Sequence, residues 1–265
     1  SLITRAGALD VPDEVKRNLI GEFVGALAES DPKKALDLAF KSSHLSIDEG
    51  RWHISGAFSQ WAKKDPSAAV AWFDRERARG TFESKSLGGS SHQLRRFQSI
   101  AIAASLTTNP AAARARLFTF PENERANILG SNEFNEITRE NPRVFATLVR
   151  ESIPEGGQRE RTLAEPTRNL VRKEGYRGVA DYADAISATP AERQEIAERA
   201  AESTFQRMGW EGDPPNLEDV AEMQSFLRSQ NQVETGRITG ESLAQFGSSN
   251  DNIDEAMSLV RDLHG

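Results

Sequence analysis

The sequence predicts an all-α protein in which about seven helical hairpins stack into a solenoid. Three observations predict this fold class. An Asp-Pro or Asn-Pro pair recurs along the chain, each pair lies between two segments whose apolar residues have helical spacing, and no segment shows the alternation of a β-strand. We expect the hairpins to form a single helical-repeat domain over residues 1–265.

The proline pairs mark the corners of the predicted hairpins. They lie 34, 44 and 32 residues apart, at Asp31-Pro32, Asp65-Pro66, Asn109-Pro110 and Asn141-Pro142. Asp and Asn are favoured N-caps because the side-chain oxygen accepts a backbone N–H of the first turn. Proline fits the first helical position and keeps the residue before it out of α geometry. Each pair therefore ends one helix and begins the next.

Apolar residues flank these corners at matching distances. The predicted core positions are Leu27, Trp61 and Ile137 before the corners, and Ala35, Leu36, Ala69, Val70, Phe145 and Ala146 after them. We interpret Trp61 and Trp72 as packing residues. Trp52 and Trp210 are less clearly placed, and either could lie in the core or on a binding face.

Three further copies of the hairpin are predicted, two without the Asp-Pro pair and, between them, a looser copy around Asp213-Pro214. They turn at Glu174-Gly175, around Asp213-Pro214 and near Asn250, and Leu170 and Phe246 take the position of Trp61 in the first and last of them. Two segments have the pattern of a capping box, Thr189 to Glu192 and, more weakly, Ser46 to Glu49.

Two regions depart from the regular repeat. A Gly/Ser-rich segment at about 80–91 lengthens the second period and predicts a flexible insertion. The repeats over 178–265 are looser and strongly acidic, because residues 179–265 carry 17 acidic and 6 basic residues and no lysine. This acidity argues against nucleic-acid binding, which needs clustered Lys and Arg. No apolar run approaches the roughly 18 residues of a membrane span, so we expect no membrane insertion.

The repeats resemble a known class of helical proteins. The segments "NIDEAMSLVRDL" and "EGYRGVADYADAI" look like the second helix of a tetratricopeptide repeat, and "WAKKDPSAAVAW" is similar to the degenerate Trp-Ala-x-x-Asp-Pro-x-Ala-Ala repeats of bacterial proteins. The resemblance covers most of residues 12–264. It implies a right-handed α–α superhelix whose first helices line a concave face, and it implies no activity.

The sequence offers no strong catalytic motif, and we expect neither a cofactor nor a bound metal. Ser30 to Lys33 matches S-x-x-K, but we interpret it as a helix cap because the companion motifs are missing. His44, Glu49 and His53 match no established ligand spacing, so a solvated loop is the preferred interpretation. The chain has no cysteine and therefore no disulfide.

An arginine stripe is the sharpest candidate for a binding site. Arg161, Arg168 and Arg172 fall within about 40° of one another on a helical wheel of about 100° per residue. Guanidinium groups bind carboxylates bidentately, which makes an acidic peptide or a C-terminus the natural ligand. Asn132 and Asn135 could add contacts to a peptide backbone. The alternatives are a solvated stripe paired with Glu160 and Glu165, or one occupied by the chain's own acidic region.

The leading functional hypothesis is a non-catalytic scaffold that binds a protein or an acidic peptide. Two alternatives stay open: a helical accessory domain of a larger enzyme, such as one acting on the cell wall, and a self-assembling module whose basic body docks on the acidic tail of the next copy. Export to the periplasm or cell envelope is slightly favoured over a cytoplasmic location, since a chain without cysteine suits an oxidising compartment.

Overall fold

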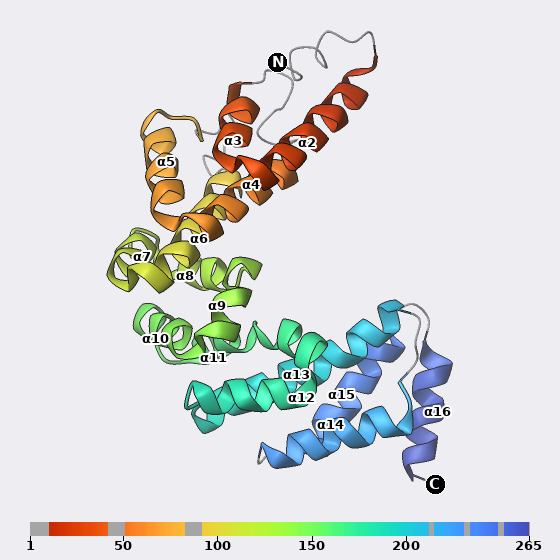
Figure 1. The fold of residues 1–265 in the computed structure, drawn as a ribbon. Coiled ribbons are helices and arrows are strands. Elements are labelled where there is room, and N and C mark those ends of the chain that lie inside the picture. The colour runs from red at the N-terminus through yellow and green to blue at the C-terminus, as the bar shows by residue number, and fades with distance from the viewer. Residues whose placement is uncertain are drawn as a thin grey trace. The chain divides into compact units, whose positions relative to one another are not determined.

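The computed structural model describes residues 11–41, 51–82, 92–211, 215–230, 234–248 and 252–264. Within these ranges the regular structure is entirely helical, with the α-helices α2 to α16, one short 3-10 helix and no strand (Figure 1). The all-α prediction is therefore confirmed. None of the described helices combines the length and the apolar character that crossing a membrane requires.

The chain divides into two compact units, Ser1–Pro121 and Glu122–Gly265. We describe each unit by itself. The prediction of one continuous repeat domain, and that of about seven hairpins in a superhelix, stay predictions.

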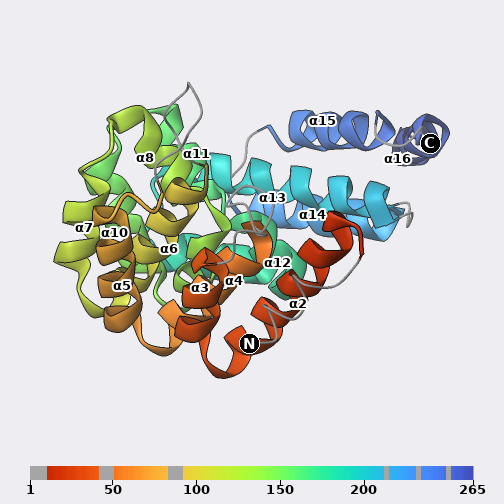
Figure 2. The same ribbon diagram turned by 90° about the horizontal axis from the view of Figure 1, so that it is seen from above.

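Unit 1 is built from three long helices, each followed by a shorter one. Its helices are α2 (Asp13–Ser30), α3 (Pro32–Lys41), α4 (Arg51–Lys64), α5 (Pro66–Ala78), α6 (His92–Thr108) and α7 (Pro110–Leu117). The long helices α2, α4 and α6 contact one another in chain order, and each also contacts the helix that follows it (Figures 1 and 2).

The three predicted corners of unit 1 are present with their caps. The side-chain oxygens of Asp31, Asp65 and Asn109 accept the backbone N–H three residues later, at 3.0, 3.0 and 3.1 Å. In each case the next helix begins at the proline. The residue before each proline has an extended backbone, with φ of −139° at Asp31 and −146° at Asp65. The helix cannot continue through such a residue, so the chain folds back.

An aromatic cluster forms the centre of the unit 1 core. Phe58 stacks on Phe97 with ring centroids 4.5 Å apart. Trp61 and Trp72 are 7% and 3% exposed, which confirms their interpretation as packing residues. Phe82 is also buried, and its ring lies 5.0 Å from that of Phe97.

Phe82 lies at the start of the predicted insertion. Residues Gly80 to Phe82 form a turn, in which Gly80 adopts the left-handed backbone (φ 76°) that a residue without a Cβ reaches at little cost. The start of this segment thus packs against the core of unit 1 through Phe82, and the flexibility of the insertion stays a prediction. The rest of the insertion, 83–91, lies outside the described residues.

Unit 2 contains the remaining helices. They are α8 (Glu122–Leu129), η1 (Asn132–Phe134), α9 (Asn135–Glu140), α10 (Pro142–Ser152), α11 (Gly157–Ala164), α12 (Thr167–Ala185), α13 (Pro190–Glu211), α14 (Leu217–Ser229), α15 (Thr235–Gly247) and α16 (Ile253–His264). The longest helix, α13, contacts α11, α12, α14 and α15 (Figure 2).

The corners of unit 2 agree with the sequence in position but not in every detail. Helix α10 begins at Pro142 as predicted, yet the Asn141 side chain makes no capping hydrogen bond, and the N–H of Val144 bonds instead to the Asn141 backbone carbonyl at 3.1 Å. The predicted turn at Glu174-Gly175 is present as a break within α12, where Gly175 has φ 65° and ψ −167°. Leu170 and Phe246 are buried, as their predicted core positions require.

The capping box at Thr189 to Glu192 is confirmed. The Thr189 N–H donates to Glu192 at 2.9 Å, and the Glu192 N–H donates to the Thr189 hydroxyl at 3.3 Å. The Glu192 side chain has no exposed surface and also receives a bidentate pair of hydrogen bonds from Arg150 on α10, at 2.6 and 3.1 Å. The cap of α13 therefore also ties α10 to α13.

The surroundings of Glu192 hold its carboxyl in the charged form. Burial by itself would raise the pKa of Glu192, but the hydrogen bonds from Arg150 and Thr189 and the charges of Arg150 and Arg159 outweigh burial, so the pKa lies below its usual range. The same hydrogen bond raises the pKa of Arg150.

Several sequence predictions fall outside the described residues. They concern the box at Ser46 to Glu49, the copy around Asp213-Pro214, the turn near Asn250, and the side chains of Trp52 and Trp210. Helix α14 is capped by Asn216, which forms a capping box with Asp219 that the sequence pattern had not singled out.

The corners allow a direct comparison of a capped and an uncapped helix. We expect Asp65→Ala to lower the free energy of unfolding by about 1 kcal/mol, because it removes the acceptor of the Ala68 N–H. Asn141→Ala removes no such bond and is expected to cost clearly less. Urea unfolding followed by circular dichroism measures both variants, and equal losses would contradict the assigned roles.

The contribution of Glu192 to the free energy of unfolding is expected to depend on pH. A folded-state pKa below the unfolded value gives stability that is complete above the unfolded pKa, about 4.3, and is lost as the pH falls through the folded pKa. Glu192→Gln is therefore expected to cost roughly 2 kcal/mol at neutral pH, since hydrogen bonds to charged groups contribute about 1.5–3 kcal/mol. The difference from wild type should shrink in acid.

Unfolding measured between about pH 3 and pH 7 tests this dependence. Glu140→Gln serves as the control, because Glu140 makes only an exposed ion pair with Arg139 at 3.4 Å and should have a near-zero effect at every pH. A pH-independent cost of Glu192→Gln would argue against the assigned role of its charge.

Candidate functional site

The predicted arginine stripe lies on two helices rather than one. Arg161 belongs to α11, whereas Arg168 and Arg172 belong to α12, because the helical hydrogen-bonding pattern is interrupted at Glu165 and Pro166. Proline has no N–H to donate, so the ladder cannot continue through it. Glu165 and Pro166 nevertheless keep helical backbone angles, so the position of Arg161 on one wheel with Arg168 and Arg172 stays a prediction. Arg168 and Arg172 keep their i, i+4 spacing and share one face of α12.

The break between α11 and α12 is held by a buried hydrogen bond. The hydroxyl of Tyr182, in the second half of α12, donates to the carbonyl of Leu163 at 2.8 Å. Burial raises the pKa of Tyr182 well above its usual range, so the hydroxyl stays a donor at all physiological pH values. Gly175 lets the second half of α12 turn back to reach α11.

The three arginines are exposed and form no ion pair with any described residue. Arg161 Nε donates to the backbone carbonyl of Gly157 at 2.8 Å, and Arg172 Nη2 donates to the Asn169 side chain at 2.7 Å. Neither bond neutralises a charge. Glu165, the partner considered in the solvated alternative, bonds instead to Arg199 on α13 at 3.3 Å.

The structure brings the two predicted asparagines together. Asn135 Nδ2 donates to Asn132 Oδ1 at 3.3 Å, so the two side-chain amides are bonded to each other. Asn132 belongs to η1 and Asn135 begins α9, and α9 contacts α12. Among the described contacts, no hydrogen bond joins the asparagines to the three arginines.

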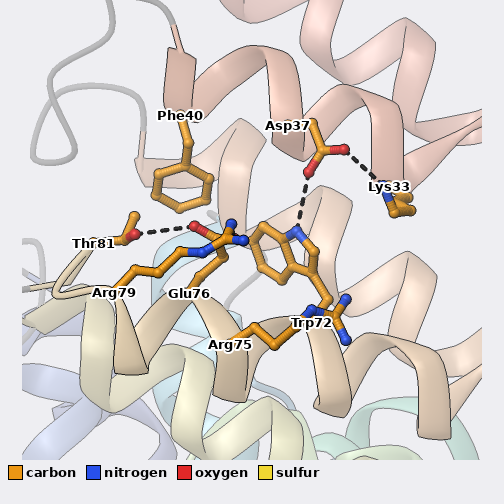
Figure 3. A pocket seen from close by; sticks show the side chains of 8 residues that line it. All are labelled: Lys33, Asp37, Phe40, Trp72, Arg75, Glu76, Arg79 and Thr81. Atoms are coloured by element: carbon orange, nitrogen blue, oxygen red, sulfur yellow. Dashed lines mark hydrogen bonds and ion pairs between the residues drawn. The ribbon is translucent and has the colours of Figure 1, made fainter.

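A pocket of about 370 Å³ lies in unit 1, away from the residues that the sequence singled out. We call it the α3–α5 pocket. It is lined by Lys33, Asp37 and Phe40 of α3, Trp72, Arg75 and Glu76 of α5, and Arg79 and Thr81 of the following turn (Figure 3). The rings of Phe40 and Trp72 lie 5.7 Å apart, and Phe40, which is half-buried, provides more apolar surface than Trp72, which is 3% exposed.

Two acid–base pairs flank the Trp72 indole in this pocket (Figure 3). Asp37 accepts a hydrogen bond from Trp72 Nε1 at 3.0 Å and pairs with Lys33 at 2.8 Å. Glu76 pairs with Arg79 at 2.7 Å and accepts a hydrogen bond from Thr81 at 3.0 Å. Both carboxylates are thus neutralised from within the pocket, whereas the Arg75 side chain has no hydrogen bond or ion pair with any described residue.

Sequence reasoning missed this pocket because its residues come from consecutive hairpins. Asp37 and Trp72 are separated by 35 residues, close to one repeat period, but a period alone does not say which side chains meet. Trp72 belongs to the core as predicted, but helical spacing does not predict that its indole N–H donates to Asp37. The sequence does show that charged residues stand four apart on both helices, Lys33 with Asp37 and Arg75 with Arg79, and residues at that spacing share one face of a helix.

No set of three metal-capable side chains gathers anywhere in the part of the chain that the structure describes. Of the trio that the sequence argued against as a metal site, His44 and Glu49 lie outside that part, as does the side chain of His53.

Comparison with known proteins adds no relative, since no family model, curated protein or solved structure matches the chain.

Proposed function

We propose that this chain is a non-catalytic helical-repeat scaffold that binds an acidic segment of a partner protein through Arg161, Arg168 and Arg172. The observation that carries the proposal is the state of these side chains: three exposed guanidinium groups on two neighbouring helices, none of which forms an ion pair with a described residue, although the charge of Arg161 also acts on the carboxyl of Glu195.

Several other arginines of unit 2 have carboxylate partners, whereas Arg143 and Arg228 form hydrogen bonds only to uncharged groups and, like the three of the stripe, no ion pair with a described residue. Arg150, Arg193, Arg199 and Arg237 of unit 2 each pair with a carboxylate within 3.3 Å. Unit 2 is rich in acidic residues, so partners for an arginine are abundant there. Arginines that remain unpaired in such surroundings are available to a carboxylate from outside.

The chain's overall negative charge supports specific recognition of an acidic segment rather than a general attraction of acidic molecules. With a net charge of −7, the protein as a whole repels acidic molecules. An acidic segment therefore binds only where the local field is positive and bidentate contacts offset the repulsion. The alternation of long and short helices in unit 1, with neighbour-to-neighbour contacts, supports the scaffold part of the proposal.

A defined acidic probe tests the proposal. We expect a fluorescein-labelled peptide of about eight glutamates to bind with rising affinity as salt is lowered. The triple variant Arg161→Gln, Arg168→Gln, Arg172→Gln should weaken binding at least tenfold, since loss of about 1.4 kcal/mol suffices and one charge-assisted hydrogen bond contributes about that much. Fluorescence anisotropy measures both proteins.

The control is a second triple variant, Arg139→Gln, Arg177→Gln, Arg228→Gln, which removes the same charge from exposed positions of unit 2. It should bind the peptide like wild type. Equal weakening in the two triple variants would reduce the effect to net charge, and no binding by wild type would overturn the proposal. Capture experiments with the same pair of variants would then identify the natural partner.

A further inference from the structure

We infer that the α3–α5 pocket is a second binding site, which takes a carboxylate attached to a flat apolar group. The inference rests on unit 1 alone and does not depend on the arginines of α11 and α12. Two sources share this chemistry: the C-terminal residue of a peptide that ends in an aromatic side chain, and a free aromatic acid.

The charges of the pocket select an anion. Its lining holds three cations, Lys33, Arg75 and Arg79, and two carboxylates. Both carboxylates already have two partners within the lining, at 3.0 Å or less. A cationic ligand would have to displace these partners, whereas an anion meets spare donors.

Among the cations of the pocket, Arg75 is the one whose side chain is available to bind an anion. Its side chain is exposed at the pocket and makes no ion pair with a described residue. A guanidinium group carries five N–H donors in a fork that matches a carboxylate. Lys33 and Arg79 each retain further donors after pairing with their own carboxylates, so they can add to the binding of the same anion.

The aromatic surface selects the apolar part of the ligand. Phe40 and Trp72 lie with their ring planes inclined at 46° and form part of the larger cluster in the core of unit 1. The hydrogen bond from Trp72 Nε1 to Asp37 fixes the indole. Trp72 is only 3% exposed, so the half-buried ring of Phe40 is the surface against which a flat group can pack.

The size of the pocket limits the ligand to about one residue. A volume of about 370 Å³ lies at the lower end of the range for small-molecule sites, roughly 300–1,000 Å³. A phenylalanine with its α-carboxylate suits this space, and a longer peptide would leave the pocket after its last residue. The site therefore binds a C-terminal residue or a small acid rather than an internal peptide segment.

Titration with small probes tests the inference. N-acetyl-phenylalanine supplies the carboxylate, and N-acetyl-phenylalaninamide is the neutral match. Binding is followed by the indole N–H signals in a ¹⁵N–¹H correlation spectrum, where Trp72→Phe identifies the Trp72 signal among those of the four tryptophans. We expect the acid to shift the Trp72 signal with a Kd on the order of 1 mM, as fits a ligand of this size, and the amide to bind at least about tenfold more weakly.

Variants of α5 separate the role of Arg75 from general charge. Arg75→Gln should weaken the acid at least about tenfold, whereas Arg77→Gln, which removes an exposed charge that does not line the pocket, should leave binding unchanged. Circular dichroism checks that all variants keep the wild-type helix content. Equal binding of acid and amide, an unchanged affinity in Arg75→Gln, or no shift of the Trp72 signal would each overturn the inference.

Two further probes distinguish the sources of the ligand. A pentapeptide ending in phenylalanine is compared with 3-phenylpropionate, both as free acids. Tighter binding of the peptide supports the inference with a protein C-terminus as the ligand, and tighter binding of 3-phenylpropionate supports it with a small aromatic acid. Binding of neither overturns it.

Discussion

The described helices depend first on how a helix ends. A proline at the first position of a helix has a fixed φ and no N–H, and it holds the residue before it in an extended conformation. In unit 1 that residue is Asp or Asn, whose side chain accepts an N–H of the new helix. One pair of residues therefore stops one helix and starts another, and the fold follows from repeating this step. Where the proline is missing, Gly175 makes the turn with a backbone conformation that other residues rarely adopt.

Polar contacts that span about one repeat period join the resulting hairpins. In unit 1, Trp72 donates to Asp37 across 35 residues, and in unit 2 Arg150 binds Glu192 across 42 residues. The ion pair between Arg237 and Glu198 spans 39 residues. Such contacts orient each hairpin against the next more specifically than apolar packing does. They also place polar side chains beside the aromatic core, which is why the α3–α5 pocket combines rings and charges.

The sequence predicted what depends on local chemistry. The helix starts at Pro32, Pro66, Pro110 and Pro142, the capping box at Thr189, and the burial of Trp61 and Trp72 all follow from capping and spacing rules that act over a few residues. The failures arise where a distant contact decides. Composition alone does not predict that Phe82, at the start of the Gly/Ser-rich segment, is buried with its ring 5.0 Å from that of Phe97.

For the candidate sites as well, the sequence predicts the local properties and not the contacts between distant residues. The identity of Arg168 and Arg172 as neighbours on one helix face is a local property, and it holds in the structure. Whether an arginine has a carboxylate partner is not local, since Glu165 lies next to the stripe in sequence yet bonds to Arg199. The α3–α5 pocket could not be predicted, because its lining joins two hairpins and a turn.

The two proposed sites share one physical requirement. An anion binds where positive side chains are left unpaired by the chain's own carboxylates, in unit 1, where residues 1–121 carry 17 basic and 13 acidic residues, as in the strongly acidic unit 2. Each site satisfies this condition through arginines whose neighbouring carboxylates are already bound to other groups: Glu165 to Arg199, and Glu76 to Arg79 and Thr81. Those internal pairs keep nearby acids from neutralising Arg168 and Arg75. In both proposals the internal ion pairs thus decide which arginines are open to an anion from outside.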